Sequence, residues 1–263
     1  MSETVSLPDQ DALGKTERRD AWWLGPLLTV LGLTTFIVYS TWAACQGDHY
    51  LYEMSGAYYL SPFYSPDIQG MFNLNLPFSF AFMILWVPAG FRGTCYYYRK
   101  AYYRSYFMDP PGCAVGEPAG RRYGGETGFP FILQNIHRYF FYLAGIVLAF
   151  LWYDAFRAFF FKNAMTGQME FGMGVGTLVL LVNVITLSGF SFGCNSLRHL
   201  IGGRLDCFSC SASTRLRHKL WGGVSILNLK HMEWAWISLT AVGFSDLYVR
   251  LCSMGIWTDW RIF

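Results

Sequence analysis

Five separate stretches of this sequence are apolar over roughly the length that an α-helix needs to cross a lipid bilayer. They occupy residues 22–43, 76–98, 129–156, 172–200 and 231–257. A spanning helix needs about 20 predominantly apolar residues. The backbone polar groups of a spanning segment must also be satisfied internally, which restricts it to helices and closed barrels. The pattern predicts an all-α, polytopic membrane protein with five transmembrane helices.

The composition agrees with a membrane protein and excludes some other classes. Only 14% of the residues are charged, whereas 53% are hydrophobic, and soluble domains average about 25% charged residues. The net charge of +3 is too small to indicate nucleic-acid binding. Residues 1–21 are polar and lack the apolar segment of a signal peptide. They predict a cytoplasmic tail in front of one membrane domain over residues 22–263.

The positions of lysine and arginine predict the orientation of the five helices. Cytoplasmic loops carry an excess of these residues. The tail and the second-to-third and fourth-to-fifth connections are rich in them, whereas residues 46–75 contain none. We therefore expect the N-terminus in the cytoplasm and the C-terminus outside.

Cysteine and histidine gather at the predicted cytoplasmic end of the helices. The residues concerned are Cys95, Cys113, His137, Cys194, His199, Cys207, Cys210 and His231. Cys207 and Cys210 have the C-x-x-C spacing of a thiolate pair that can hold one metal. A disulfide between them is disfavoured in a reducing cytoplasm. A membrane cysteine can also be a small apolar filler, and that alternative stays open for each of them.

His137 lies in the polar sequence QNIHRY, which we expect one to two turns into the third helix. Polar and ionisable groups at membrane depth are costly and by default indicate a functional site. A quinone headgroup needs hydrogen-bond donors for its two carbonyl oxygens, which Gln134, His137 and Arg138 can supply, with Tyr97 as an aromatic neighbour. The alternative is hydrogen bonding between helices.

Two cofactors suit this layer of the molecule. Haem b would take two axial histidines, such as His137 or His199 with His231. A Rieske-type [2Fe–2S] cluster would take two cysteines and two histidines. Haem ligated by two histidines needs no cysteine, so the surplus of cysteines favours the cluster, but spacing alone leaves both open. Cys194 and His199 are five residues apart, roughly 140° around a helix, and would share a centre only if the helix end unwinds at Gly202 and Gly203.

Several long motifs resemble one membrane-anchor family. They are TCYYYRKAYYRSYFMDPPGCAV, GETGFPFILQNIHRYFFYLA, RHLIGGRL and HMEWAWISL. The sequence is similar to the five-helix anchor subunit of actinobacterial-type succinate dehydrogenases. The resemblance implies a place in the bacterial plasma membrane, flavoprotein and iron–sulfur partner subunits, a menaquinone acceptor and a Rieske-type [2Fe–2S] cluster in place of haem. A small extra membrane subunit or a trimer is also compatible with it.

The resemblance also implies a set of cluster ligands. The matching positions are Cys95, Cys113, His137, Cys194, His199 and His231, supplemented here by Cys207 and Cys210. The chain has Asn195 and Leu197 where the family pattern has a histidine and a cysteine, which would change the ligation.

The expected function is therefore that of a quinone-reactive anchor of succinate:menaquinone oxidoreductase. The chain has no dinucleotide-binding glycine fingerprint, so we expect no succinate-oxidising site on it. Two alternatives remain, namely an anchor that uses haem b and a redox-inactive scaffold or transporter. Transporters usually carry inverted repeats and broken helices, and neither is evident in the sequence.

Overall fold

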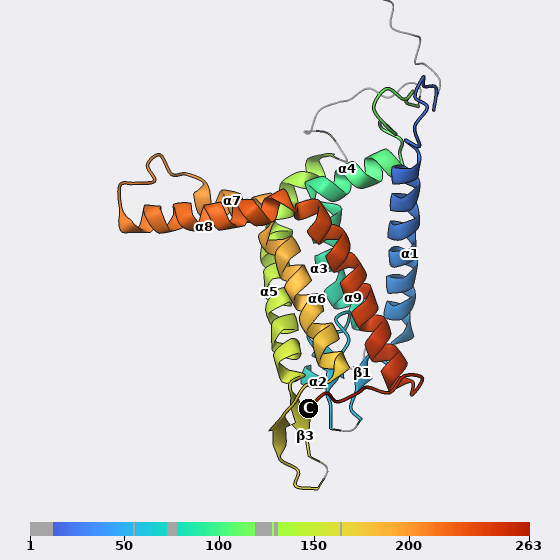
Figure 1. Ribbon diagram of the computed structural model, residues 1–263, viewed down its shortest axis with the longest axis vertical. Coiled ribbons are helices and arrows are strands. Elements are labelled where there is room, and N and C mark those ends of the chain that lie inside the picture. Colours follow the sequence, from blue (N-terminus) through green and yellow to red (C-terminus); the bar gives the residue numbers. More distant parts are fainter. Residues whose placement is uncertain (1–12, 55, 73–77, 119–127, 129–130, 164) are drawn as a thin grey trace, which may run out of the picture. The chain divides into compact units, whose positions relative to one another are not determined.

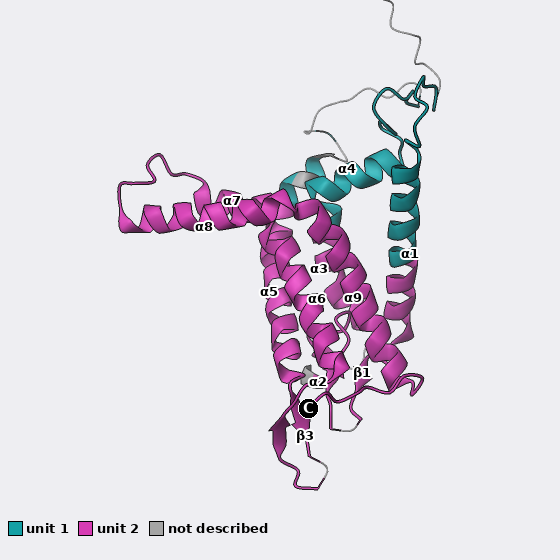
Figure 2. Cartoon of the chain, in the orientation of Figure 1, with its two compact units in different colours: residues 1–37, 92–136 teal, residues 38–91, 137–263 magenta. Residues whose placement is uncertain are grey.

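The computed structural model describes residues 13–54, 56–72, 78–118, 128, 131–163 and 165–263 (Figure 1). Most of the predicted tail, the beginnings of the second and third apolar stretches, and Arg121 and Arg122 lie outside these residues. The chain divides into two compact units (Figure 2). Unit 1 contains Met1–Ile37 and Arg92–Ile136, and unit 2 contains Val38–Phe91 and His137–Phe263. Each unit is described by itself.

The chain is mainly helical, as predicted. The five apolar stretches contain the helices α1 (Leu24–Gln46), α3 (Ala81–Gly93), α5 (His137–Arg157), α6 (Val175–Phe192) and α9 (His231–Ser253). Within the described residues, three helices are long and apolar enough to cross a membrane, namely α1, α5 and α6. The apolar helix α3 is shorter, at 13 residues. A total of five spans stays a prediction.

The helix boundaries differ from the predicted stretches at three places. In the second stretch, helix α3 ends at Gly93, and a separate helix, α4 (Tyr96–Ser105), begins after Cys95. In the third, a 3-10 helix over Phe131–Ile136 precedes α5, so His137 is the first residue of α5 and follows about two turns of 3-10 helix. In the fourth, α6 ends before Gly193, and the short helix α7 (Asn195–Gly202) follows.

Elements that were not predicted fill the connections. Helix α8 (Ala212–Leu229) occupies most of the expected fourth-to-fifth loop, and the short α2 covers Ile68–Phe72. Two antiparallel hairpins pair β1 (Leu51–Tyr52) with β2 (Tyr59–Leu60), and β3 (Phe160–Lys162) with β4 (Met169–Phe171). The hairpins are the only strands in the part of the chain that the structure describes.

In unit 1, the segment before α1 pairs with a distant loop. The backbone N–H of Gly14 donates to the carbonyl of Gly116 over 3.0 Å, and the N–H of Gly116 donates to the carbonyl of Lys15 over 2.8 Å. The Arg18 guanidinium donates to the carbonyl of Cys113 over 3.0 Å. Residues 14–18 are therefore held against residues 113–116.

In unit 2, the helices α5, α6 and α9 lie side by side, and α7 and α8 extend across them (Figure 1). Small residues allow the close approaches. A Cβ atom on Gly90 of α3 would lie 2.1 Å from the Phe140 ring of α5, and one on Gly189 of α6 would lie 2.6 Å from the Trp234 ring of α9. Such positions are typical of helix packing in membranes.

Helix α9 carries a buried ion pair near its C-terminal end. Asp246 and Arg250 have side-chain exposures of 0% and 1%, and the nearest N–O distance is 3.5 Å. Asp246 also accepts hydrogen bonds from Ser61 and, over 2.6 Å, from Tyr39. The guanidinium donates to the carbonyls of Ala43 and Asp48. These bonds join α9 to the end of α1 and to the hairpin segment, all within unit 2.

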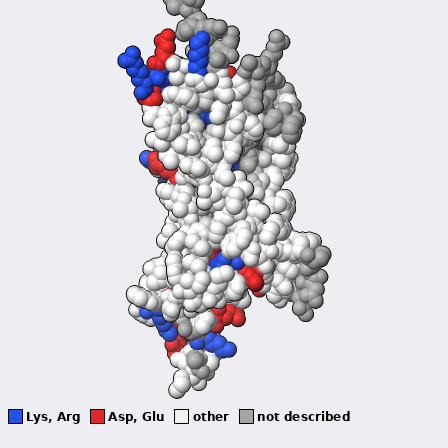
Figure 3. Space-filling view, turned by 90° about the vertical axis from the view of Figure 1, so that its right-hand side faces the viewer, with Lys and Arg blue, Asp and Glu red and all other residues white. Residues whose placement is uncertain are grey.

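Charged side chains are sparse on one face of the molecule (Figure 3). On the face that Figure 3 draws, lysine, arginine, aspartate and glutamate gather in a few patches, and most of the remaining surface is uncharged. The large exposed apolar side chains of α5 include Ile146, Tyr153 and Phe156. Such a surface suits contact with lipid better than contact with water.

Candidate functional site

The break between α6 and α7 brings a cysteine against the first residue of α5. Cys194 is the N-cap of α7 in an extended conformation, and its sulfur accepts a hydrogen bond from the N–H of Ser196 over 3.4 Å. His137 Nε2 lies 3.1 Å from Cys194 Sγ. Burial raises the pKa of the Cys194 thiol, which favours the protonated form. The pair is thus an imidazole–thiol contact at the end of the helices.

Two phenylalanine rings connect His137 to His231. The His137 ring stacks on Phe91 with a centroid separation of 4.9 Å. Phe91 meets Phe190 edge to face at 5.4 Å, and Phe190 stacks on His231 at 4.9 Å. Both phenyl rings are buried. The space between the two histidines is therefore filled by packed aromatic side chains, which does not favour a haem held axially by His137 and His231.

A second contact joins Arg138, the residue after His137, to His199 of α7. Arg138 Nη2 lies 2.9 Å from His199 Nδ1. Both line an open cleft of about 560 Å³. The residues around the cleft are Arg138, Asn195, Ser196, Arg198, His199, Gly202, Gly203 and Trp221. Among these described lining residues, three carry basic groups and none is acidic.

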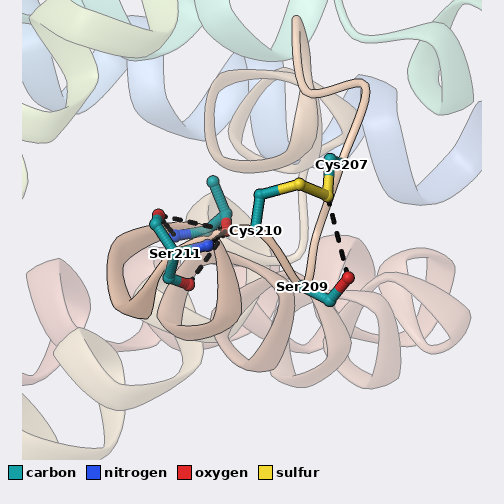
Figure 4. The surroundings of a disulfide bond; sticks show 5 residues. Cys207, Ser209, Cys210 and Ser211 are labelled. Atoms are coloured by element: carbon teal, nitrogen blue, oxygen red, sulfur yellow. Dashed lines mark hydrogen bonds between the residues drawn. A yellow bond between two sulfur atoms is a disulfide. The ribbon is translucent and has the colours of Figure 1, made fainter.

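Cys207 and Cys210 are joined by a disulfide next to the start of α8 (Figure 4). Their Cα atoms lie 5.7 Å apart, which is within the range that a disulfide requires. The expectation that a disulfide is disfavoured here is wrong for this structure. Metal binding by the two residues stays a prediction, and it requires the reduced pair because a metal binds the thiolate.

The remaining predicted site residues belong to unit 1 or have a side chain outside the described part of the chain. Cys95, Cys113 and Tyr97 belong to unit 1. Cys95 is the buried N-cap of α4, Cys113 is exposed, and the Tyr97 ring packs edge to face on Tyr98 at 5.7 Å. The side chain of Gln134 lies outside the described part of the chain.

The described residues do not form a metal-binding group. No three histidine, cysteine, aspartate or glutamate side chains among them come close enough to hold one ion. Sequence reasoning missed Phe91, Phe190 and Trp221, which complete the aromatic series and the cleft. No local pattern distinguishes these three from the many other aromatic residues of the chain.

Comparison with known proteins decides the family. The family model of the actinobacterial succinate dehydrogenase subunit SdhC matches residues 24–255. The chain belongs to this family. As an SdhC-type chain, it is a membrane subunit of a succinate dehydrogenase, and the predicted resemblance is confirmed.

A solved structure agrees with this SdhC assignment. A chain of the Mycobacterium smegmatis Sdh1 complex in the apo form is 41% identical, with a TM-score of 0.85. The match covers 100% of this chain and 98% of that chain. No curated protein matches the sequence.

Proposed function

We propose that this chain is the quinone-reactive anchor of a succinate:menaquinone oxidoreductase and that the quinone headgroup binds in the Arg138–His199 cleft. The observation that carries the proposal is the 2.9 Å contact between these two side chains at an open cleft. Arg138 was predicted as a quinone donor. His199 was predicted as a metal ligand, and its place beside Arg138 favours quinone binding instead.

The cleft has the chemistry that a quinone needs. Reduction of a quinone adds two electrons and two protons, and negative charge develops on the two carbonyl oxygens. An arginine carries a permanent charge and donates hydrogen bonds in a fixed geometry. An imidazole can hold or pass a proton near neutral pH. Trp221 adds an aromatic side chain to the lining of the cleft. His137 adds a further polar group next to Arg138 in the sequence.

The electrons come from outside this chain. We infer flavoprotein and iron–sulfur partner subunits, supported by the match to a chain of the Sdh1 complex. Succinate is oxidised in the flavoprotein, and the iron–sulfur subunit passes electrons to the quinone. The basic connection between the second and third apolar stretches, which includes Lys100 and Arg104, would face the soluble subunits on the cytoplasmic side.

The five-span topology is part of the same proposal. Helix α9 has 23 residues, about 35 Å at 1.5 Å per residue, and thus exceeds the roughly 30 Å hydrocarbon core. Its polar residues Asp246 and Arg250 are buried and paired, so they do not prevent insertion. The shorter α3 is the fifth span. Cysteine labelling from each side of the membrane tests this topology and the inside N-terminus.

The fit of a Rieske-type cluster is incomplete. Such a cluster takes two histidines and two cysteines. Within the described residues, one imidazole and one thiol meet at His137 and Cys194, and no third ligand-type side chain joins them. We therefore derive no electron-transfer step through a cluster. Low-temperature EPR together with an optical spectrum of the dithionite-reduced complex separates a cluster, haem b and a redox-inactive anchor.

The quinone proposal is tested with Arg138→Gln and His199→Gln in the whole complex. We expect each variant to lower quinone reduction with succinate by 10-fold to 100-fold, on the order expected for a lost hydrogen bond to a charged group. Succinate oxidation with a soluble dye acceptor should be unchanged. Lys162→Gln, which removes a charge from an exposed residue of β3, is the control. Unchanged quinone kinetics in both cleft variants would contradict the proposal.

A further inference from the structure

Helices α7 and α8, with residues 203–211 between them, form an arm that extends across the direction of α5, α6 and α9 (Figure 1). All of these elements belong to unit 2 (Figure 2). The arm leaves the bundle at the end where α6 stops at Phe192 and α9 starts at His231. Since α5 and α6 are long and apolar enough to cross a membrane, an arm that runs across them lies along the membrane plane, next to the edge of the hydrocarbon core.

The face of α8 that packs on α7 is mostly polar. Arg217 Nε donates to the carbonyl of Ile201 over 2.7 Å, and Arg198 of α7 donates to Ser225 over 3.2 Å and to Asn228 over 3.3 Å. Positions 217, 221, 225 and 228 share one side of a helix. The hydrogen-bonding side chains of the arm are therefore used between its two helices.

The opposite face of α8 exposes large aliphatic side chains. Leu216, Leu220 and Ile226 are 58%, 51% and 69% exposed, and they lie within roughly 120° of one another around the helix. In a hairpin surrounded by water, the apolar faces would pack together and the polar faces would be exposed. This arm has the inverse arrangement, so its outer face requires an apolar environment.

The charge of the arm identifies that environment. Residues 195–230 contain six lysines and arginines and one acidic residue, Asp206. Arg215 and Lys219 are exposed. At about 100° per residue, Arg215 lies at the edge of the aliphatic face, next to Ile226, and Lys219 lies within it. Interfacial helices combine an apolar face with flanking basic residues that attract anionic lipids. Long basic side chains can also keep their charge in the headgroup layer while their stems lie on apolar surface.

We propose that the arm lies in the membrane surface, with Leu216, Leu220 and Ile226 in the boundary between lipid headgroups and acyl chains, and with Arg215 and Lys219 at anionic phosphates. The proposal does not rest on quinone binding, because the outer face of α8 is not part of the cleft. It requires only that α5 and α6 cross the membrane.

Photo-crosslinking in the assembled complex tests the proposal. A benzophenone amino acid replaces Leu220 or Ile226, one at a time, and the complex is irradiated in native membranes. The same substitution at His218, roughly 160° around the helix from Leu220, is the matched control. Ile146, which is 57% exposed on α5, is the positive control for lipid contact. Adducts are identified by mass spectrometry.

We expect phospholipid adducts at Leu220 and Ile226, several-fold more abundant than at His218 and comparable with those at Ile146. An adduct with another subunit or a second copy of this chain would overturn the proposal and make the face a protein interface. Absence of lipid adducts at both sites, with lipid adducts at Ile146, would overturn it as well. If one substitution prevents assembly, the other gives the same information from a different turn of α8.

The role of the charges is tested separately with Arg215→Gln and Lys219→Gln combined with the label at Ile226. We expect total lipid adducts to persist and the anionic share of them to fall by at least half. An unchanged anionic share would remove the two residues from the proposal.

Discussion

His137 Nε2 lies 3.1 Å from Cys194 Sγ, although 57 residues separate the two in the sequence. The contact depends on the interruption of the fourth apolar stretch at Gly193, which turns the chain and presents Cys194 at the first turn of α7. An uninterrupted helix through residue 200 would have placed this sulfur on a helix face and not at a helix N-terminus.

Substitution of Cys194 distinguishes a structural role of its thiol from a role as a metal ligand. Cys194→Ser keeps an N-cap acceptor for Ser196 and a partner for His137, so we expect the melting temperature of the purified complex to stay close to that of the parent. Cys194→Val removes both hydrogen bonds and should cost about 1–2 kcal/mol. Iron content is measured on the same samples. A loss of iron in Cys194→Ser with unchanged stability would assign the thiol to a metal, whereas equal iron in all three proteins would leave it a structural residue.

Breaking the buried pair in α9 should be costly. Asp246→Leu leaves the Arg250 guanidinium buried without its carboxylate, which typically costs about 3–5 kcal/mol. The double variant Asp246→Leu/Arg250→Leu should recover part of that loss, because no uncompensated charge remains. Thermal unfolding of the purified complex in detergent measures the loss of stability in the single variant and its recovery in the double variant. A single variant as stable as the parent protein would show that the pair contributes little.

Alanine substitutions at a crowded and an uncrowded helix glycine should differ in their effect on stability. Gly189→Ala places a methyl group 2.6 Å from the Trp234 ring and should lower the melting temperature, because overpacking costs about 1–3 kcal/mol. Gly145→Ala in α5 meets nothing within 4 Å and should leave the melting temperature unchanged or slightly raised, since alanine favours helix. Equal effects at the two sites would contradict the packing described here.

Arg217 holds the C-terminal end of α7. Its guanidinium donates to the carbonyls of Leu200, Ile201 and Gly203, which the helix itself leaves without partners. We expect Arg217→Gln to accelerate amide hydrogen exchange over residues 195–205. Arg215→Gln, on the exposed side of the same helix, is the matched control and should leave the exchange of those residues unchanged.

The length and apolarity of five stretches were enough to predict the helical class and the approximate positions of the long helices. They could not predict α8, because a scan for apolar length does not detect a helix of mixed composition. A weak local signal was present, since Ser211 and Thr214 form a capping box at the start of α8. The usual partner at that second position is glutamate or glutamine, and threonine makes the pattern less distinctive.

The candidate site was harder to predict than the fold, for two physical reasons. Its contacts, such as Arg138 with His199, join residues far apart in the sequence, and their geometry depends on where α6 ends. The sequence suggested unwinding at Gly202 and Gly203, whereas the chain turns at Gly193. The C-x-x-C spacing of Cys207 and Cys210 suits a metal and a disulfide equally well, so spacing alone could not distinguish between them.

The polar partners of α9 have a consequence for how the protein is made. A helix that carries Asp246 and Arg250 inserts poorly by itself. The groups that satisfy these two residues belong to Tyr39, Ala43, Asp48 and Ser61, all of which leave the ribosome about 185 or more residues before Asp246. When α9 emerges, the residues that satisfy its buried pair have already been synthesised, so this pair gains its partners as soon as α9 packs against the end of α1.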